Sequence, residues 1–323
     1  MSDGASTTFL FTGQGAQSAG MGRELLETFP SVRELFAEAN RVVGFDLASA
    51  CVDGDSATLE QTSVQQPAIF LVSAAYLTVF RERGGNGRAM AAAAGLSLGE
   101  YTALYAAGAV DFSAALNLVR HRGRLMQESG EKQSGGMACL MSLELPAVQE
   151  ICDQAADGGV LTPANLNCPG QIVISGDKKA CERALELAAK KGKRGVALKV
   201  SGAFHSPLMA DAAEELKGHL EATAFRVPDV PVYSNVTGEP HTGPDEIREQ
   251  LYQQMTRPVL WQRCIENMCS AGLGPFVEFG PGKVLTGLLR RIDRAIDCQN
   301  LSSVEDMEKM PSETDMDVKE VAS

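Results

Sequence analysis

The alternation of apolar and polar stretches along the chain predicts the βα units of an α/β protein. Residues 8–12, with an apolar centre at 9–11, read as a short buried strand that ends in a glycine-rich loop, and residues 89–94 form an apolar run that breaks at Gly95. Short apolar runs bounded by glycine are typical of buried strands in a parallel sheet. Helical periodicity appears over residues 66–82 and 98–107. The pattern therefore predicts an α/β fold with a large body built on a parallel sheet.

The middle of the chain has a different order of elements. Residues 135–200 read as strand, helix, two strands, helix and strand, which is the βαββαβ order of a ferredoxin-like unit. We expect a small ferredoxin-like subdomain there, inserted into a large subdomain formed by residues 1–134 and 201–301. The final segment, 302–323, is polar and acidic without periodicity, so we expect it to be disordered.

The net charge of −12 is unevenly distributed and restricts the possible partners. Residues 302–323 hold seven acidic side chains and two lysines, a charge of −5, which leaves −7 for the rest of the chain. A body of that sign repels a phosphate backbone, so we predict no nucleic-acid partner. No secretory signal and no apolar run of membrane-spanning length is apparent, which predicts a cytoplasmic protein without a membrane partner. We expect it to be a monomer.

The sequence offers no pattern for a metal or a cofactor. Its eight cysteines are scattered without the spacing of a zinc site or a disulfide framework. The loop at residues 13–17 lacks the third glycine of a dinucleotide fingerprint, and no acid follows at the expected distance. We therefore predict that neither a metal ion nor a nucleotide cofactor takes part.

The first candidate for chemistry is Ser97, which lies in the pentapeptide Gly-Leu-Ser-Leu-Gly at residues 95–99. In a G-x-S-x-G elbow, small flanking residues permit a strained turn that raises the serine hydroxyl above the sheet. The predicted strand before Ser97 and helix after it are the required context. The alternative is a serine kept only for the backbone geometry of a tight turn.

A serine nucleophile needs a base, and the chain has four histidines. His121, His219 and His241 fall on polar helix faces or in a turn, where we expect them to be solvated. His205 differs, because it follows a predicted strand and precedes a helix for which Ser206 is a suitable N-cap. Such strand ends line the sites of α/β folds. We predict that His205 is the general base, with a structural loop histidine as the alternative.

Arg122 is predicted to face the protein interior. On a helical wheel of residues 115–126 it falls near the middle of the apolar arc, whereas Arg120 and Arg124 fall outside it. A buried guanidinium requires an anionic partner. That partner is either an acidic side chain of the fold or the free carboxylate of a substrate held by the guanidinium fork.

Several segments together resemble a known family, the malonyl-CoA:acyl carrier protein transacylases. The matching segments follow the family's order along the chain and are residues 13–17, 95–101, 122–127, 165–171, 202–206 and 278–285. The resemblance implies an α/β-hydrolase-like body with an inserted ferredoxin-like subdomain. It also implies malonyl-CoA and acyl carrier protein as partners, and a ping-pong reaction through a malonyl-serine that supplies fatty-acid or polyketide synthesis.

The resemblance assigns roles to individual positions. It implies a catalytic dyad of Ser97 and His205, with the histidine oriented by a backbone carbonyl of the segment 257–261. Arg122 matches the arginine that binds malonate. The oxyanion site matches Gln14 and the backbone amide of the residue after the serine, which is Leu98 here.

Two further positions bear on the acyl group. The residue before the nucleophile is most often histidine in that family and is Leu96 here, so we expect altered packing around the acyl group with activity retained. Phe204 resembles the version that selects malonyl, because a bulky ring would crowd an α-methyl branch.

Three other functions compete with this prediction. An α/β-hydrolase esterase would need its acid and histidine after the serine, in the order Ser, Asp, His. A non-catalytic scaffold could bind the carrier protein, and a related transacylase could prefer another acyl group. Covalent labelling of Ser97 by malonyl-CoA distinguishes the enzyme from the scaffold.

Overall fold

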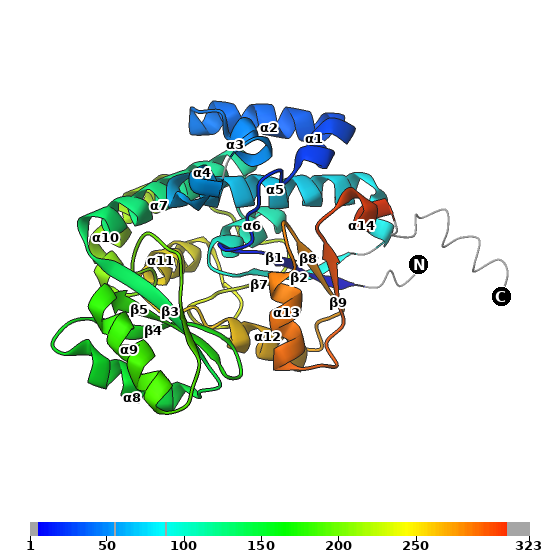
Figure 1. The fold of residues 1–323 in the computed structure, drawn as a ribbon. Helices are drawn as coiled ribbons and strands as arrows, with labels where there is room; N and C mark the ends of the chain where they lie inside the picture. Colours follow the sequence, from blue (N-terminus) through cyan, green and yellow to red (C-terminus); the bar gives the residue numbers. More distant parts are fainter. Residues whose placement is uncertain (1–5, 55, 88, 309–323) are drawn as a thin grey trace.

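The large body of the protein is built on a five-stranded parallel sheet, seen in the computed structural model in Figure 1. The structure describes residues 6–54, 56–87 and 89–308. The strand order is β7-β2-β1-β8-β9, and every pairing is parallel. The strands are β1 (Thr7–Phe11), β2 (Met90–Gly95), β7 (Val232–Tyr233), β8 (Phe276–Phe279) and β9 (Cys298–Leu301).

Helices cover both faces of this sheet, and Figure 1 shows α1–α5 on one side and α12 and α13 on the other. The first group comprises α1 (Arg23–Thr28), α2 (Pro30–Val43), α3 (Leu47–Val52), α4 (Ser56–Glu60) and α5 (Thr62–Glu82), followed by the short η1 (Gly84–Gly87). The central helices are α6 (Leu98–Ala106) and α7 (Phe112–Lys132). The later helices are η2 (Pro207–Met209), α10 (Ala210–Ala222), α11 (Pro244–Gln254), α12 (Trp261–Ser270), α13 (Val284–Ile292) and α14 (Val304–Glu308).

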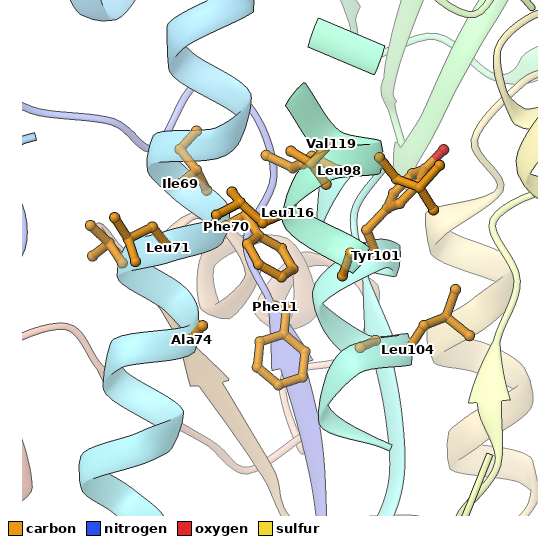
Figure 2. Close-up of a cluster of buried hydrophobic side chains, with 14 of the residues drawn as sticks. Phe11, Ile69, Phe70, Leu71, Ala74, Leu98, Tyr101, Leu104, Leu116 and Val119 are labelled. Carbon is orange, nitrogen blue, oxygen red and sulfur yellow. The ribbon is translucent and has the colours of Figure 1, made fainter. Parts of the chain in front are cut away.

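Alternation along β1 separates the two hydrophobic layers. Phe9 and Phe11 pack into the cluster that contains α5 and α6, whereas Leu10 joins the cluster of Trp261 and Leu285 on the opposite face. Because successive side chains of a strand point to opposite faces, β1, whose five residues are all buried, must be covered on both sides. Figure 2 shows Phe11 lying between α5 and α6 in the first of these layers.

The small subdomain is a four-stranded antiparallel sheet covered by two helices. Its elements are β3 (Gly135–Met141), α8 (Leu145–Ala156), β4 (Leu161–Cys168), β5 (Gln171–Asp177), α9 (Lys178–Lys190) and β6 (Gly195–Ala197). The strand order β4-β5-β3-β6 places the first and third strands of the βαββαβ unit in the centre. The α/β class and the antiparallel subdomain are therefore as the sequence predicts. The last strand is three residues long, shorter than its apolar pattern indicated.

The prediction of a disordered C-terminal segment is wrong for residues 302–308. These residues include α14, whose Met307 is buried in the main hydrophobic cluster. The Tyr76 hydroxyl donates a hydrogen bond to the Ser302 carbonyl at 2.5 Å. Val304 also packs against this cluster, so two apolar side chains and a backbone anchor hold the start of an otherwise acidic segment. The rest of the predicted tail, 309–323, lies outside the described residues.

One helix of the described residues, α5, is long and apolar enough to cross a membrane, which the sequence reading did not anticipate. Most of it is buried within the protein, where it packs against α7, α6 and α2. A helix that is apolar all round is typical of the core of a large domain as well as of a membrane span. Its burial here identifies α5 as a core helix.

Candidate active site

Ser97 lies in a strained turn between β2 and α6. Its backbone angles, φ 52° and ψ −99°, are rare for a residue other than glycine. The flanking glycines explain how the turn forms, since a Cβ at Gly95 would lie 2.0 Å from Gly99 and a Cβ at Gly99 would lie 2.1 Å from the Phe11 carbonyl oxygen. The pentapeptide thus has a steric origin, and it holds the serine at the N-terminus of α6.

His205 forms the hydrogen bonds expected of a general base. Its Nε2 lies 2.8 Å from Ser97 Oγ, and its Nδ1 lies 2.7 Å from the Gln254 carbonyl oxygen. A carbonyl can only accept, so Nδ1 carries the proton and Nε2 is free to accept from the serine hydroxyl. The orienting carbonyl is therefore that of Gln254, at the end of α11, and the assignment to residues 257–261 is wrong. The C-terminal turn of α11 leaves this carbonyl free, because it lies among the last helical residues.

The surroundings of His205 keep its imidazole neutral. Burial, followed by the neighbouring Arg122 guanidinium, lowers the pKa of His205 to about 3, and the Gln254 carbonyl offsets only part of this effect. The folded-state pKa lies far below the ordinary value of about 6.5, so the neutral base is the form present at physiological pH. The ring can therefore accept the serine proton without first losing one of its own.

Arg122 extends from α7 to Ser97 and is fully buried, as the helical wheel predicts. Its Nη2 donates to Ser97 Oγ and to Gln254 Oε1, both at 2.9 Å, and its Nη1 donates to Gln66 Oε1 at 2.8 Å. The guanidinium also lies over the Tyr101 ring, 5.4 Å from its centroid. All three hydrogen-bond acceptors are neutral, and within the described ranges no acidic side chain forms an ion pair with it.

A cavity of about 360 Å³ opens beside Ser97, between the large body and the small subdomain. Five of the predicted site residues lie close together here, since Ser97, His205, Gln14, Leu96 and Phe204 all line it. Strands of the small subdomain contribute amide side chains to its wall, namely Asn165, Asn167 and Gln171. A cleft of this volume is typical of a small-molecule site.

The two residues predicted for the oxyanion site approach the nucleophile in different ways. Gln14 is half-buried in the loop after β1, which touches the serine turn so closely that a Cβ at Gly13 would lie 2.3 Å from the Leu96 carbonyl oxygen. The Leu98 side chain points into the hydrophobic layer of Figure 2 and does not line the cavity. Leu98 can contribute only through its backbone N–H, in the first turn of α6.

Sequence reasoning missed a polar network behind the nucleophile. Gln254, Asn235 and Glu100 are all fully buried and bonded to the serine turn or to one another. The only available signal was for Gln254, which falls on the apolar face of α11 seven residues after the buried Ile247. The other two contacts join distant parts of the chain and leave no periodic pattern.

The prediction that His241 is solvated is wrong. Its side chain is fully buried, and its Nε2 lies 2.9 Å from Glu100 Oε1. The turn that carries it folds back on β7, where His241 N–H donates to the Val232 carbonyl, so the ring is directed inward. By contrast, His121 and His219 are half-buried and stack on each other between α7 and α10, away from the cavity.

Comparison with known proteins identifies the class of enzyme. The acyl transferase domain family matches residues 8–317, which defines the protein as an acyltransferase. The malonyl CoA-acyl carrier protein transacylase of Bacillus subtilis is 43% identical over 302 residues, which cover 93% of this chain and 94% of the relative. The chain belongs to the malonyl CoA-acyl carrier protein transacylase family.

Solved structures of similar proteins share the whole fold. A malonyl-CoA:acyl carrier protein transacylase from Xanthomonas oryzae has 41% sequence identity and a TM-score of 0.90, covering 94% of this chain and 96% of that one. A malonyl-transacylase in complex with a type II polyketide synthase acyl carrier protein has 37% identity and a TM-score of 0.91, covering 95% of this chain and 99% of that one.

Proposed function

We propose that this protein transfers malonyl from malonyl-CoA to the phosphopantetheine thiol of an acyl carrier protein, through a malonyl ester of Ser97. The observation that carries the proposal is the burial of Arg122 with only neutral hydrogen-bond acceptors. A buried guanidinium that has only neutral acceptors is costly, and it lies 2.9 Å from the nucleophilic oxygen. The free carboxylate of a malonyl group on Ser97 supplies the missing anion, in bidentate geometry.

The hydrogen bonds around Ser97 support a two-stage reaction. His205 Nε2 removes the hydroxyl proton as Ser97 Oγ attacks the thioester carbonyl, and the tetrahedral oxyanion is stabilised by the Leu98 N–H and the Gln14 side chain. The intermediate then expels the CoA thiolate, which takes the proton from His205. In the second stage the carrier's thiol gives its proton to His205 and attacks the malonyl ester, forming the malonyl thioester, and the departing Ser97 Oγ takes the proton back from His205.

The environment of His205 argues against an esterase. A hydrolase triad orients its histidine with a carboxylate, whereas here the Nδ1 proton is held by the Gln254 carbonyl. Transfer to a second thiol also requires an ester that survives while the first product leaves. Ser97 and His205 are 9% and 4% exposed, so water has limited access to an acyl group held there.

Leu96 and Phe204 are proposed to shape the acyl pocket. Both are buried and line the cavity beside Ser97. An apolar leucine before the nucleophile takes no part in proton transfer, and the Phe204 ring restricts the space available to a branched acyl group. These two side chains therefore favour the unbranched malonyl group over its α-methyl homologue.

The partner and the compartment follow from the same proposal. One structural relative is in complex with an acyl carrier protein, and the lining of the cavity here includes the exposed residues Leu198, Lys199 and Val284. A mixed apolar and basic opening suits an acidic carrier with a buried pantetheine arm. The described cysteines are free thiols, most of them buried, which suits the reducing cytoplasm.

Intact-mass measurement tests the proposed function directly. Incubation with malonyl-CoA is expected to add one malonyl group to the protein, and peptide mapping should place it on Ser97. Addition of holo-acyl carrier protein should then remove the adduct and malonylate the carrier. A protein that hydrolyses malonyl-CoA without labelling the carrier would be an esterase, and one that binds the carrier without any adduct would be a scaffold.

The low pKa of His205 predicts acylation that is insensitive to moderate acid. A base whose pKa is depressed to about 3 is lost only when the pH falls toward that value, so the rate of Ser97 acylation should stay nearly constant from about pH 8 to about pH 5. Stopped-flow or rapid-quench labelling at each pH measures this rate. A fall in the acylation rate centred at about pH 6.5 would show that the base is an ordinary solvated histidine.

A matched variant identifies the source of that shift. Removing the Arg122 guanidinium takes away a positive charge beside the ring and admits water, and both changes raise the pKa of His205. The acid limb for acetyl-CoA labelling should therefore move to higher pH in Arg122→Ala. An unmoved limb would mean that the guanidinium does not act on the base.

A further inference from the structure

Glu100 is a buried carboxylate that the reaction described above does not use. It lies in the first turn of α6, three residues after Ser97, and is fully buried. Its Oε2 accepts from Gln254 Nε2 at 2.7 Å and from the Asn235 backbone N–H at 3.0 Å, and its Oε1 lies 2.9 Å from His241 Nε2. Three donors converge on one carboxylate directly behind the nucleophile.

These contacts determine which way the Gln254 amide points. Its Nε2 donates both to Glu100 Oε2 and to the Ser97 carbonyl oxygen, at 2.7 and 3.1 Å. The Glu100 oxygen and the Ser97 carbonyl oxygen both accept from this amide, so its nitrogen must face them. The amide oxygen is then the atom that faces Arg122, 2.9 Å from Nη2. A flipped amide would place its NH₂ against the guanidinium and its oxygen against the carboxylate.

We propose that Glu100 is a positioning residue for malonyl selectivity, which acts by orienting the Gln254 amide so that its oxygen directs Arg122 toward the acyl group. The inference rests on the proposed function. Arg122 Nη2 is shared between Gln254 Oε1 and Ser97 Oγ, so the direction of this N–H group depends on where the amide oxygen lies. Gln66 fixes only the other nitrogen, Nη1.

Glu100 also supports the serine turn, and this second role must be separated from the first. Asn235, whose backbone binds Glu100, accepts from the Ser97 N–H at 2.6 Å and donates to the Gly95 carbonyl at 2.8 Å. Loss of that support would slow acylation by every acyl-CoA alike. Loss of Arg122 orientation would slow malonyl transfer alone, because an acetyl group has no carboxylate. The ratio of malonyl to acetyl labelling therefore distinguishes the two roles.

Two substitutions at Glu100 provide the first test, with the malonyl-to-acetyl ratio of Ser97 labelling rates as the readout. Glu100→Met keeps the length but removes the acceptor, and the ratio should fall about tenfold or more. Glu100→Gln should retain most of the ratio. Its amide oxygen can still accept from Gln254, while its NH₂ donates to His241 after a change of tautomer, since His241 Nδ1 has no hydrogen-bond partner among the described residues.

Gln254→Met provides the second test and does not depend on the folding of a Glu100 variant. The backbone carbonyl of residue 254 still holds His205, and the malonyl-to-acetyl ratio should fall as it does in Glu100→Met, whatever the substitution does to the rate common to both substrates. Combining the two substitutions should lower the ratio no further than either alone. Additive losses would show that Glu100 and Gln254 act separately and would overturn the proposal.

Other outcomes of these experiments would also overturn the proposal. An equal loss of both substrates in a folded Glu100→Met protein, by circular dichroism and melting temperature, would mean that Glu100 only supports the turn. If Glu100→Met does not fold, a wild-type ratio in Gln254→Met overturns the proposal by itself. Failure of the wild-type protein to form any malonyl adduct would instead refute the proposed function, which keeps the two claims distinguishable.

Discussion

Replacing Ser97 with alanine is expected to abolish the malonyl adduct and to lower transfer to the carrier by at least ~10⁴-fold. The hydroxyl is the only nucleophile in contact with both His205 and Arg122, at 2.8 and 2.9 Å among the described residues. The variant should fold, because alanine lacks only the oxygen and meets the same backbone conformation. Intact-mass labelling with malonyl-CoA and a coupled transfer assay measure the two losses.

His205→Ala should slow adduct formation without removing its site. General-base catalysis contributes typically ~10²–10⁴-fold, so labelling of Ser97 should persist at a rate reduced by about that factor. Ser73→Ala is a matched control for Ser97→Ala, because both remove a buried serine hydroxyl. The Ser73 hydroxyl has no hydrogen-bond partner in the described part of the chain. Full labelling of Ser97→Ala, or an undiminished rate in His205→Ala, would refute the dyad.

Replacing Arg122 with alanine is expected to invert the acyl preference while Ser97 stays reactive. A malonyl carboxylate would be buried without its partner, and losing one side of a buried charge pair costs ~2–5 kcal/mol, or roughly 30- to 4,000-fold in kcat/KM. Acetyl-CoA brings no carboxylate, so its transfer should not fall and should rise if the unpaired guanidinium is costly in the wild-type protein. The ratio of malonyl to acetyl labelling of Ser97 is the discriminating measurement.

A surface arginine two residues further along the same helix serves as the control for this experiment. Arg124 lies on the same helix but pairs with Glu128 and Glu215 at the protein surface. Its replacement by alanine should leave the ratio unchanged, because exposed ion pairs contribute little. If Arg122→Ala reduced both substrates equally and lowered the melting temperature, Arg122 would be a structural residue and the malonate assignment would be wrong.

The sequence by itself identified the residues whose role depends on local geometry. Glycines two positions before and two positions after Ser97 mark it in the sequence, and a Cβ at either glycine would lie 2.0 or 2.1 Å from backbone atoms, so no larger residue fits there. His205 was distinguished from three other histidines by its place between a strand and an N-cap, and Arg122 by its position on the apolar face of a helix. Each signal extends over a few residues, so periodicity and turn chemistry are enough to find it.

Only the tertiary structure decided what surrounds those residues. The carbonyl that orients His205 belongs to Gln254, and a backbone carbonyl has no sequence signature, so a resemblance placed it a few residues too late. Glu100 and His241 are 141 positions apart in the sequence. Nothing in the local pattern around either residue predicts that the fold buries both side chains against each other. Burial of Met307 likewise depends on a cluster assembled from distant helices and strands. Short-range patterns determine which way a side chain faces within its own element, whereas its partners and its solvation depend on elements that the chain brings together only on folding.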